Sequence, residues 1–269
     1  LAARLVDAVE RETGLELPLT SMFGDDTLAG MARALGEGAP DARAPIVEIH
    51  PDGTRAPFVF LHGDFTAGGF YSRALAVALG DDQPVLIVHP HGLVDPHVPE
   101  SIEAMAADHV KAVRARRPRG PYVLGGHCNG ALVAFEMARQ LTAAGEEVPA
   151  VVLVEAQAPE PPGDGPRRFL RIGRDGLPEA LEARDRVSDV ELRYRHIIDR
   201  YAGAPWAGRV VVIHARESFP AGDAGWSRFA PDCETHVLPG GHVTLITRHL
   251  AELAAVVRDA IARASKVTA

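Results

Sequence analysis

The sequence predicts an α/β fold, in which a mostly parallel sheet is covered by helices on both faces. Short apolar stretches, among them 58–62, 85–88 and 151–154, alternate with longer segments of helical spacing. Strands without polar positions are typical of a sheet that is buried on both faces. Regular alternation of strands and helices favours parallel pairing, because each helix carries the chain back to the same end of the sheet.

The expected elements follow in a simple order. We expect strands at 58–62, 85–88, 121–125, 151–154, 210–213 and 235–238, and helices at 72–79, 101–117, 129–144 and 243–263. Ser101 is a suitable N-cap for the second of these helices, and Gly145 follows the end of the third. Histidines at 62, 89 and 91 end strands, whereas those at 109, 196 and 249 are expected on helix surfaces.

Residues 157–205 interrupt this alternation. The segment contains several Pro and Gly residues and a basic cluster at Arg167, Arg168, Arg171 and Arg174. A connection of this length is typically functional, so we interpret it as a lid over the strand ends. A solvated surface excursion is the alternative interpretation of the arginines.

The N-terminal part is expected to be separate from the sheet domain. Residues 1–38 have the pattern of two helices, with Asp26 or Thr27 as the N-cap of the second, and are too few for a stable core of their own. A linker with Pro and Ala residues, 39–57, joins them to the main domain, 58–264.

Composition excludes several classes of function. The net charge of −8 argues against general nucleic-acid binding, which needs a basic surface. No apolar run approaches the ~20 residues of a membrane helix, and no signal segment is present. The only cysteines, Cys128 and Cys233, indicate neither a disulfide framework nor a metal site. We therefore expect a cytoplasmic protein without a bound metal or cofactor.

A candidate nucleophile lies in the motif "GGHCNG" at 125–130, between an expected strand and an expected helix. Gly126-x-Cys128-x-Gly130 has the form of the nucleophile elbow G-x-S-x-G, with sulfur in place of oxygen. Side chains at the two glycine positions would collide with neighbouring backbone in so tight a turn. The alternative is a buried cysteine that acts only as a small apolar residue.

A thiol nucleophile needs a base and an acid that orients the base. His242 follows the last expected strand on a glycine-rich loop, and in this type of fold the chain order is nucleophile, acid, histidine. Glu155 and Glu217 both follow expected strands between Cys128 and His242, and both are candidates for the acid.

The oxyanion of the reaction is expected to bind backbone N–H groups. One donor belongs to Asn129, the residue after the nucleophile, and the other to the loop after the first strand, where Asp64 is the candidate. We expect the Asp64 carboxylate to turn away from the developing negative charge.

These segments together resemble the thioesterase domains that end nonribosomal peptide and polyketide synthetases. The resemblance covers about 58–155 and 208–262, in the stretches "FVFLHGDFTAGGFY", "YVLGGHCNGALVAFEMARQL", "VVLVEA" and "GGHVTLI". It implies an α/β-hydrolase fold with a lid, and it favours Glu155 over Glu217, although the family commonly has aspartate there. The stretch "TGLELPLTSMFGDDTLAGMARAL" is similar to the last helices of a carrier domain, without the upstream motif that holds the phosphopantetheine serine.

The resemblance implies a terminal thioesterase whose partners are an upstream carrier domain and synthetase modules. Cys128 would accept an acyl or peptidyl chain from the carrier's 4′-phosphopantetheine, and release would follow by hydrolysis, cyclisation or aminolysis. A thioester on Cys128 stays more activated than an oxoester, which suits a weak or strained nucleophile. The alternatives are a hydrolase of free esters or lactones with a Cys-His-acid triad, and a non-catalytic module that docks a carrier.

Overall fold

The computed structural model describes residues 8–9, 11–15, 27–37, 44–63, 69–93, 96–160, 189–219 and 222–267. Its centre is a seven-stranded sheet in the order β1-β3-β2-β4-β5-β6-β7. The strands are β1 (Ile46–Ile49), β2 (Phe58–Leu61), β3 (Val85–Val88), β4 (Val123–His127), β5 (Ala150–Val154), β6 (Val210–Ala215) and β7 (Cys233–Leu238). All neighbouring strands pair in parallel except β1 and β3, which are antiparallel. The predicted α/β class is confirmed.

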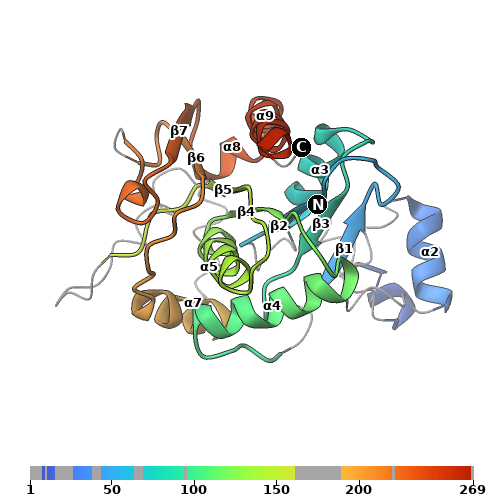
Figure 1. Cartoon of the computed structure of the whole chain (residues 1–269). Helices are drawn as coiled ribbons and strands as arrows, with labels where there is room; N and C mark the ends of the chain where they lie inside the picture. The colour runs from blue at the N-terminus through green and yellow to red at the C-terminus, as the bar shows by residue number, and fades with distance from the viewer. Residues whose placement is uncertain are drawn as a thin grey trace.

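Helices cover both faces of this sheet (Figure 1). The described helices are α2 (Leu28–Glu37), α3 (Phe70–Leu79), α4 (Ile102–Arg116), α5 (Asn129–Ala143), α7 (Asp189–Arg200), α8 (His242–Leu245) and α9 (Leu250–Val267), with a 3₁₀ turn at Trp226–Arg228. Helices α4, α5 and α7 lie on one face, and α3 and α9 lie on the other. Alternate residues of each strand point to opposite faces, so Val59 and Leu61 join the first core while Phe58 and Phe60 join the second.

Most expected helices and strands occur within a few residues of their predicted bounds. The Ser101 hydroxyl accepts a hydrogen bond from the Ala104 N–H at 3.1 Å and caps α4, as predicted. Thr27 caps α2 in the same way, through the Gly30 N–H at 3.0 Å. The expected closing helix is divided into α8 and α9. His109 on α4 is buried, so its placement on a helix surface was wrong.

The linker expected at 39–57 contains a strand that the sequence analysis missed. Ile46–Ile49 forms β1 at the edge of the sheet, where Ile46 is buried and pairs with Val88. An antiparallel edge strand needs no preceding helix, so the alternation of elements carries no signal for it. Glu48 of β1 also forms an ion pair with Arg117 at 3.1 Å.

The expected lid, 157–205, is described only in part. Residues 161–188, with all four arginines of the basic cluster, lie outside the described residues. The described part includes α7, whose Tyr194, Ile197 and Ile198 are buried in the core on the α5 side of the sheet.

Two further observations concern the described residues alone. None of the helices in this part of the chain is both long and apolar enough to cross a membrane. Within the same residues, no group of three or more His, Cys, Asp or Glu side chains is arranged to hold a metal ion.

Candidate active site

The elbow between β4 and α5 holds Cys128 in a backbone conformation that few residues adopt. Cys128 has φ 55° and ψ −124° and is half-buried. A Cβ at Gly126 would lie 2.5 Å from the backbone of Gly130, and one at Gly130 would collide with the carbonyl of Leu61. The Cys128 N–H donates to Val154 O at 2.9 Å. The collision predicted for the two glycine positions is therefore present, and it leaves room only for glycine.

The structure brings Glu155 and His242 together beside this elbow. Glu155 directly follows β5 and has a positive φ of 54°. Its side chain is fully buried, and Oε2 lies 3.0 Å from His242 Nδ1. Its other oxygen, Oε1, accepts a hydrogen bond from the Ala215 N–H at the end of β6. Both carboxylate oxygens are thus occupied, and each partner is a donor.

Glu217, the other candidate acid, lies on the surface. Glu217 is exposed, and its backbone N–H donates to Gly240 O at 3.1 Å. Its carboxylate lies near Gly241, the residue before His242. The ion pair of the His242 imidazole is formed with Glu155.

The charges around His242 favour its protonated form. Burial lowers the pKa of His242, but the negative charge of Cys128 and hydrogen bonds with Cys128 and Glu155 outweigh burial and raise this pKa to about 10. The largest contribution that raises it comes from Cys128. The imidazole is therefore placed between a sulfur and a carboxylate, and these interactions stabilise its protonated form.

The oxyanion side of the site is described in part. Asn129 begins α5, so its backbone N–H is one of the groups that have no acceptor within the helix. Gly63 lies against it: a Cβ there would be 3.0 Å from Asn129 N and 3.2 Å from Cys128 Cβ. Gly63, which follows β2, therefore lies directly beside the elbow. Asp64 lies outside the described residues.

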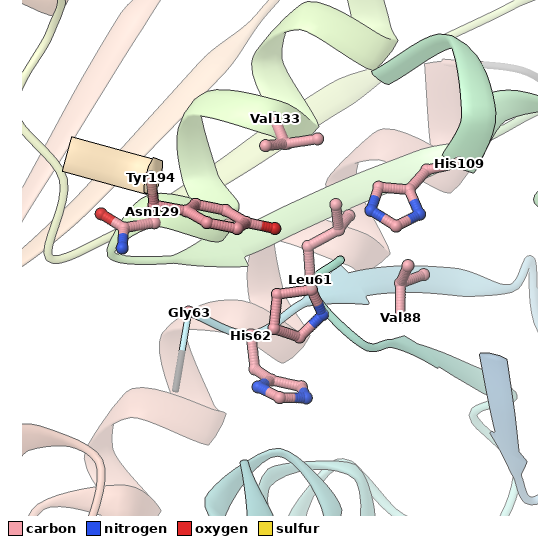
Figure 2. A pocket seen from close by; sticks show the side chains of 10 residues that line it. Leu61, His62, Gly63, Val88, His109, Asn129, Val133 and Tyr194 are labelled. Atoms are coloured by element: carbon pink, nitrogen blue, oxygen red, sulfur yellow. The ribbon is translucent and has the colours of Figure 1, made fainter. Parts of the chain in front are cut away.

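A hollow opens beside Asn129 (Figure 2). Its apolar walls come from the ends of β2 and β3 and from α5, through Leu61, Val88 and Val133. In Figure 2 the Tyr194 ring lies across the hollow, with the His109 ring at its far side. None of the described residues that line it carries a permanent charge. Helix α7 from the expected lid region thus forms one wall of this hollow.

Two side chains that were not predicted from the sequence, His127 and Tyr71, lie next to the His–Glu pair. His127, the last residue of β4, stacks on His242 with ring centroids 4.8 Å apart, and its Nδ1 lies 2.9 Å from the Tyr71 hydroxyl. A signal was available for His127. His127 is four residues after Val123 in β4, so the two side chains point to the same face of the sheet. Helices α3 and α9 cover that face.

The α/β-hydrolase class is defined by an elbow at a strand–helix turn. An acid and then a histidine follow it along the chain, at the ends of later strands. Residues 60–167 match the family model described as "Thioesterase domain". This part of the chain is similar to thioesterase domains.

Comparison with known proteins agrees with this assignment. Chondramide synthase of Chondromyces crocatus is 34% identical over 173 residues, which are 61% of this chain and 4% of the relative. A dimodular nonribosomal peptide synthase of Bacillus subtilis is 31% identical over 176 residues, 64% of this chain and 7% of the relative. The crystal structure of the NocB thioesterase domain from the nocardicin cluster superposes with a TM-score of 0.64 at 26% identity, covering 81% of this chain and 99% of that one. The chain therefore spans less than a tenth of these two curated relatives.

Proposed function

We propose that this chain is the terminal thioesterase of a nonribosomal peptide or polyketide synthetase, with Cys128 as nucleophile, His242 as base and then acid, and Glu155 as the residue that orients His242. One observation carries the proposal: the buried Glu155 carboxylate lies 3.0 Å from His242 Nδ1, and the same imidazole interacts with Cys128 at the elbow. The match of residues 60–167 to the thioesterase family supports it.

In the proposed acylation step, the Cys128 thiolate attacks the carbonyl carbon of a thioester on the carrier's 4′-phosphopantetheine. The tetrahedral oxyanion receives hydrogen bonds from the Asn129 N–H and from the loop after β2, where Asp64 remains the candidate. The C–S bond to pantetheine breaks, and the departing thiolate takes the proton of the His242 imidazolium. The enzyme is left with an acyl group on Cys128 and a neutral imidazole.

In the proposed release step, the neutral His242 accepts a proton from an amine, hydroxyl or water that attacks the acyl carbonyl. The bond to Cys128 Sγ breaks, so the thiolate and the imidazolium form again together. Loss of the acyl group thus restores the starting charges without an external acid. The three modes of release, namely aminolysis, cyclisation and hydrolysis, differ only in the attacking group.

The proposed partners are an upstream carrier domain and the modules of the synthetase. The relatives are named as synthases, and the chain matches a small part of each. Residues 1–38 are proposed to be the end of the carrier, of which the helix α2 is described. We also propose a cytoplasmic setting, because a reducing compartment keeps the Cys128 thiol free.

The test uses the whole chain with a synthetic acyl-pantetheine thioester. We expect Cys128→Ala to form no acyl-enzyme by intact-protein mass spectrometry, and Cys128→Ser to form it more slowly. Cys233→Ala is the matched control and should be acylated as the wild type is. Acylation of Cys128→Ala at the wild-type rate would refute the nucleophile assignment.

The same assay separates the alternative functions. A hydrolase of free esters or lactones would process a simple ester of the same acyl group as fast as the pantetheine thioester. A non-catalytic docking module would form no acyl-enzyme even in the wild type. We expect acylation by the thioester and little turnover of the ester.

A further inference from the structure

His242 is the first residue of a short helix that follows two glycines. Helix α8 is four residues long and follows Gly240, which has φ 89°, and Gly241. The Thr244 hydroxyl accepts a hydrogen bond from the Gly241 N–H at 2.8 Å, which closes this turn. These local contacts hold the backbone, whereas Glu155 holds one edge of the imidazole through Nδ1. Cys128 is the other hydrogen-bond partner of the imidazole, and both partners act at the edge of the ring and leave its face to other contacts.

A second imidazole lies against the face of His242. The rings of His127 and His242 are 4.8 Å apart between centroids and are inclined by 33°. His127 belongs to β4 in the middle of the sheet and is 3% exposed. It therefore provides a rigid surface, because a buried residue of a central strand moves little relative to the sheet.

Tyr71 holds the His127 ring in turn. Its hydroxyl lies 2.9 Å from His127 Nδ1, and the two rings meet at 68° with centroids 5.0 Å apart. Tyr71 is in the first turn of α3. The other nitrogen of His127, Nε2, is buried and forms no hydrogen bond within the described residues. One hydrogen bond thus fixes the ring orientation.

The surroundings keep His127 uncharged. Burial lowers the pKa of His127 well below 6.5, and the charges of His242 and His62 lower it further. Titratable groups near His127 come from the end of β2, from α3, from α8 and from the elbow: His62, Tyr71, His242 and Cys128. A neutral ring can lie against an imidazolium, whereas two imidazolium rings at this distance would repel each other.

We propose that His127 is a positioning residue for His242, whose ring, held by Tyr71, keeps the His242 imidazole in the plane that faces both Glu155 and Cys128. This inference rests on the proposed function, because the proposed function assigns His242 to proton transfer. It adds a residue that touches neither substrate nor the reacting atoms. The stack also joins the start of α3 to the base of the reaction.

The experiment compares three variants with a matched control. His127→Leu removes the flat ring, His127→Phe keeps a flat ring without nitrogens, and Tyr71→Phe removes only the hydroxyl. The control is Tyr122→Phe, which deletes the hydroxyl that donates to Arg117 O at 2.7 Å. Tyr122 directly precedes β4, at the end of that strand opposite the elbow. The titration of His242 is followed by NMR in the intact chain, and alkylation of Cys128 by iodoacetamide is timed at pH 7.

We expect His127→Leu to lower the midpoint of the His242 titration by about 1 pH unit or more, since a rotated imidazole loses contact with Cys128 or Glu155. Alkylation of Cys128 and kcat should fall by roughly 10- to 100-fold, in line with small misplacements of catalytic groups, with KM for the thioester within about twofold. His127→Phe should recover most of the midpoint, and Tyr71→Phe should change it in the same direction as His127→Leu but less. Tyr122→Phe should lower only the melting temperature.

A wild-type His242 titration in His127→Leu would overturn the proposal. If that variant does not fold, Tyr71→Phe decides the question, because it keeps the aromatic ring and the packing. An unchanged His242 titration and Cys128 alkylation rate in Tyr71→Phe would then overturn the proposal. Neither measurement needs a substrate. Failure of the wild type to be acylated would refute the proposed function. The titration and alkylation data would still decide whether His127 positions His242.

Discussion

Replacement of Glu155 by glutamine changes only one oxygen to an NH₂ group, and the structure shows why that is severe. The two oxygens of Glu155 accept hydrogen bonds from two different donors, the Ala215 N–H and the His242 imidazole. The amide has one oxygen for these two donors. Because the side chain is fully buried, no water can take the place of the lost acceptor.

Either orientation of the amide has a cost. If its oxygen faces Ala215, the NH₂ group faces His242 Nδ1 and selects the tautomer with the proton on Nε2, which cannot accept a proton from a nucleophile. If the oxygen faces His242, the buried Ala215 N–H meets another donor, at a cost of about 1–3 kcal/mol of stability. The corresponding amide substitution in the serine-protease example lowers turnover by ~10⁴-fold. We expect Glu155→Gln to slow acylation by roughly 10²- to 10⁴-fold.

The effect on stability should depend on pH with a defined sign. The pKa of His242 is raised to about 10 when folded, so its contribution to stability is fully present below the unfolded value of about 6.5 and is lost as pH rises through 10. Glu155→Gln removes part of that contribution. The difference in unfolding free energy between wild type and variant should therefore shrink from pH 6.5 to pH 10.

The assay is single-turnover acylation by a pantetheine thioester, together with urea unfolding at several pH values. Glu217→Gln is the control, because Glu217 is exposed. Its backbone N–H, which the substitution keeps, donates the hydrogen bond to Gly240 O. It should acylate within about twofold of the wild type, as is usual for surface changes. A larger loss in Glu217→Gln than in Glu155→Gln would refute the reasoning and move the acid to Glu217.

Three further predictions use the same protein. Iodoacetamide at pH 7 should label Cys128 rapidly and Cys233 slowly, because burial and the nearby Asp223 and Asp232 raise the pKa of Cys233 to about 11; peptide mapping that finds equal labelling would contradict this. After alkylation of Cys128 the sulfur is uncharged, so the NMR titration of His242 should move below its value of about 10; an unchanged midpoint would mean that Cys128 contributes no charge. Gly130→Ala should destabilise the fold by roughly 1–3 kcal/mol, since its Cβ would overlap the Leu61 carbonyl; a wild-type melting temperature would count against the elbow geometry.

The sequence predicted the elements whose patterns are local. Fully apolar runs such as 85–88 and 151–154 are strands, and the Ser101 cap begins a helix, because burial and capping depend on neighbouring residues. The edge strand β1 has only a short local signal, because its β-branched residues are interrupted by Glu48 and no helix precedes it. Its four residues, with Glu48 among them, form a strand only because β3 offers an antiparallel edge.

Chain order is what pointed to the candidate site. Cys128 at a glycine-flanked turn and His242 on a late loop follow the order expected for the fold, and in the structure the His242 imidazole interacts with Cys128 and with Glu155. Contacts across the sheet were not predictable in this way. The stack of His127 on His242 joins residues from β4 and α8, and only the packing of α8 on the sheet brings the two rings together.

The same sheet explains how the Glu155 side chain reaches His242. Cys128 and Glu155 both leave their strands with a positive φ, and each is tied to the next strand: the Cys128 N–H donates to Val154 O, and the Glu155 N–H donates to Ile213 O at 2.8 Å. Strand register therefore sets the distance between Cys128 and Glu155. Loop length does not enter it. The additional methylene of Glu155 is accommodated because Oε1 reaches across to the Ala215 N–H, which fixes the far end of the longer side chain and leaves Oε2 to face His242.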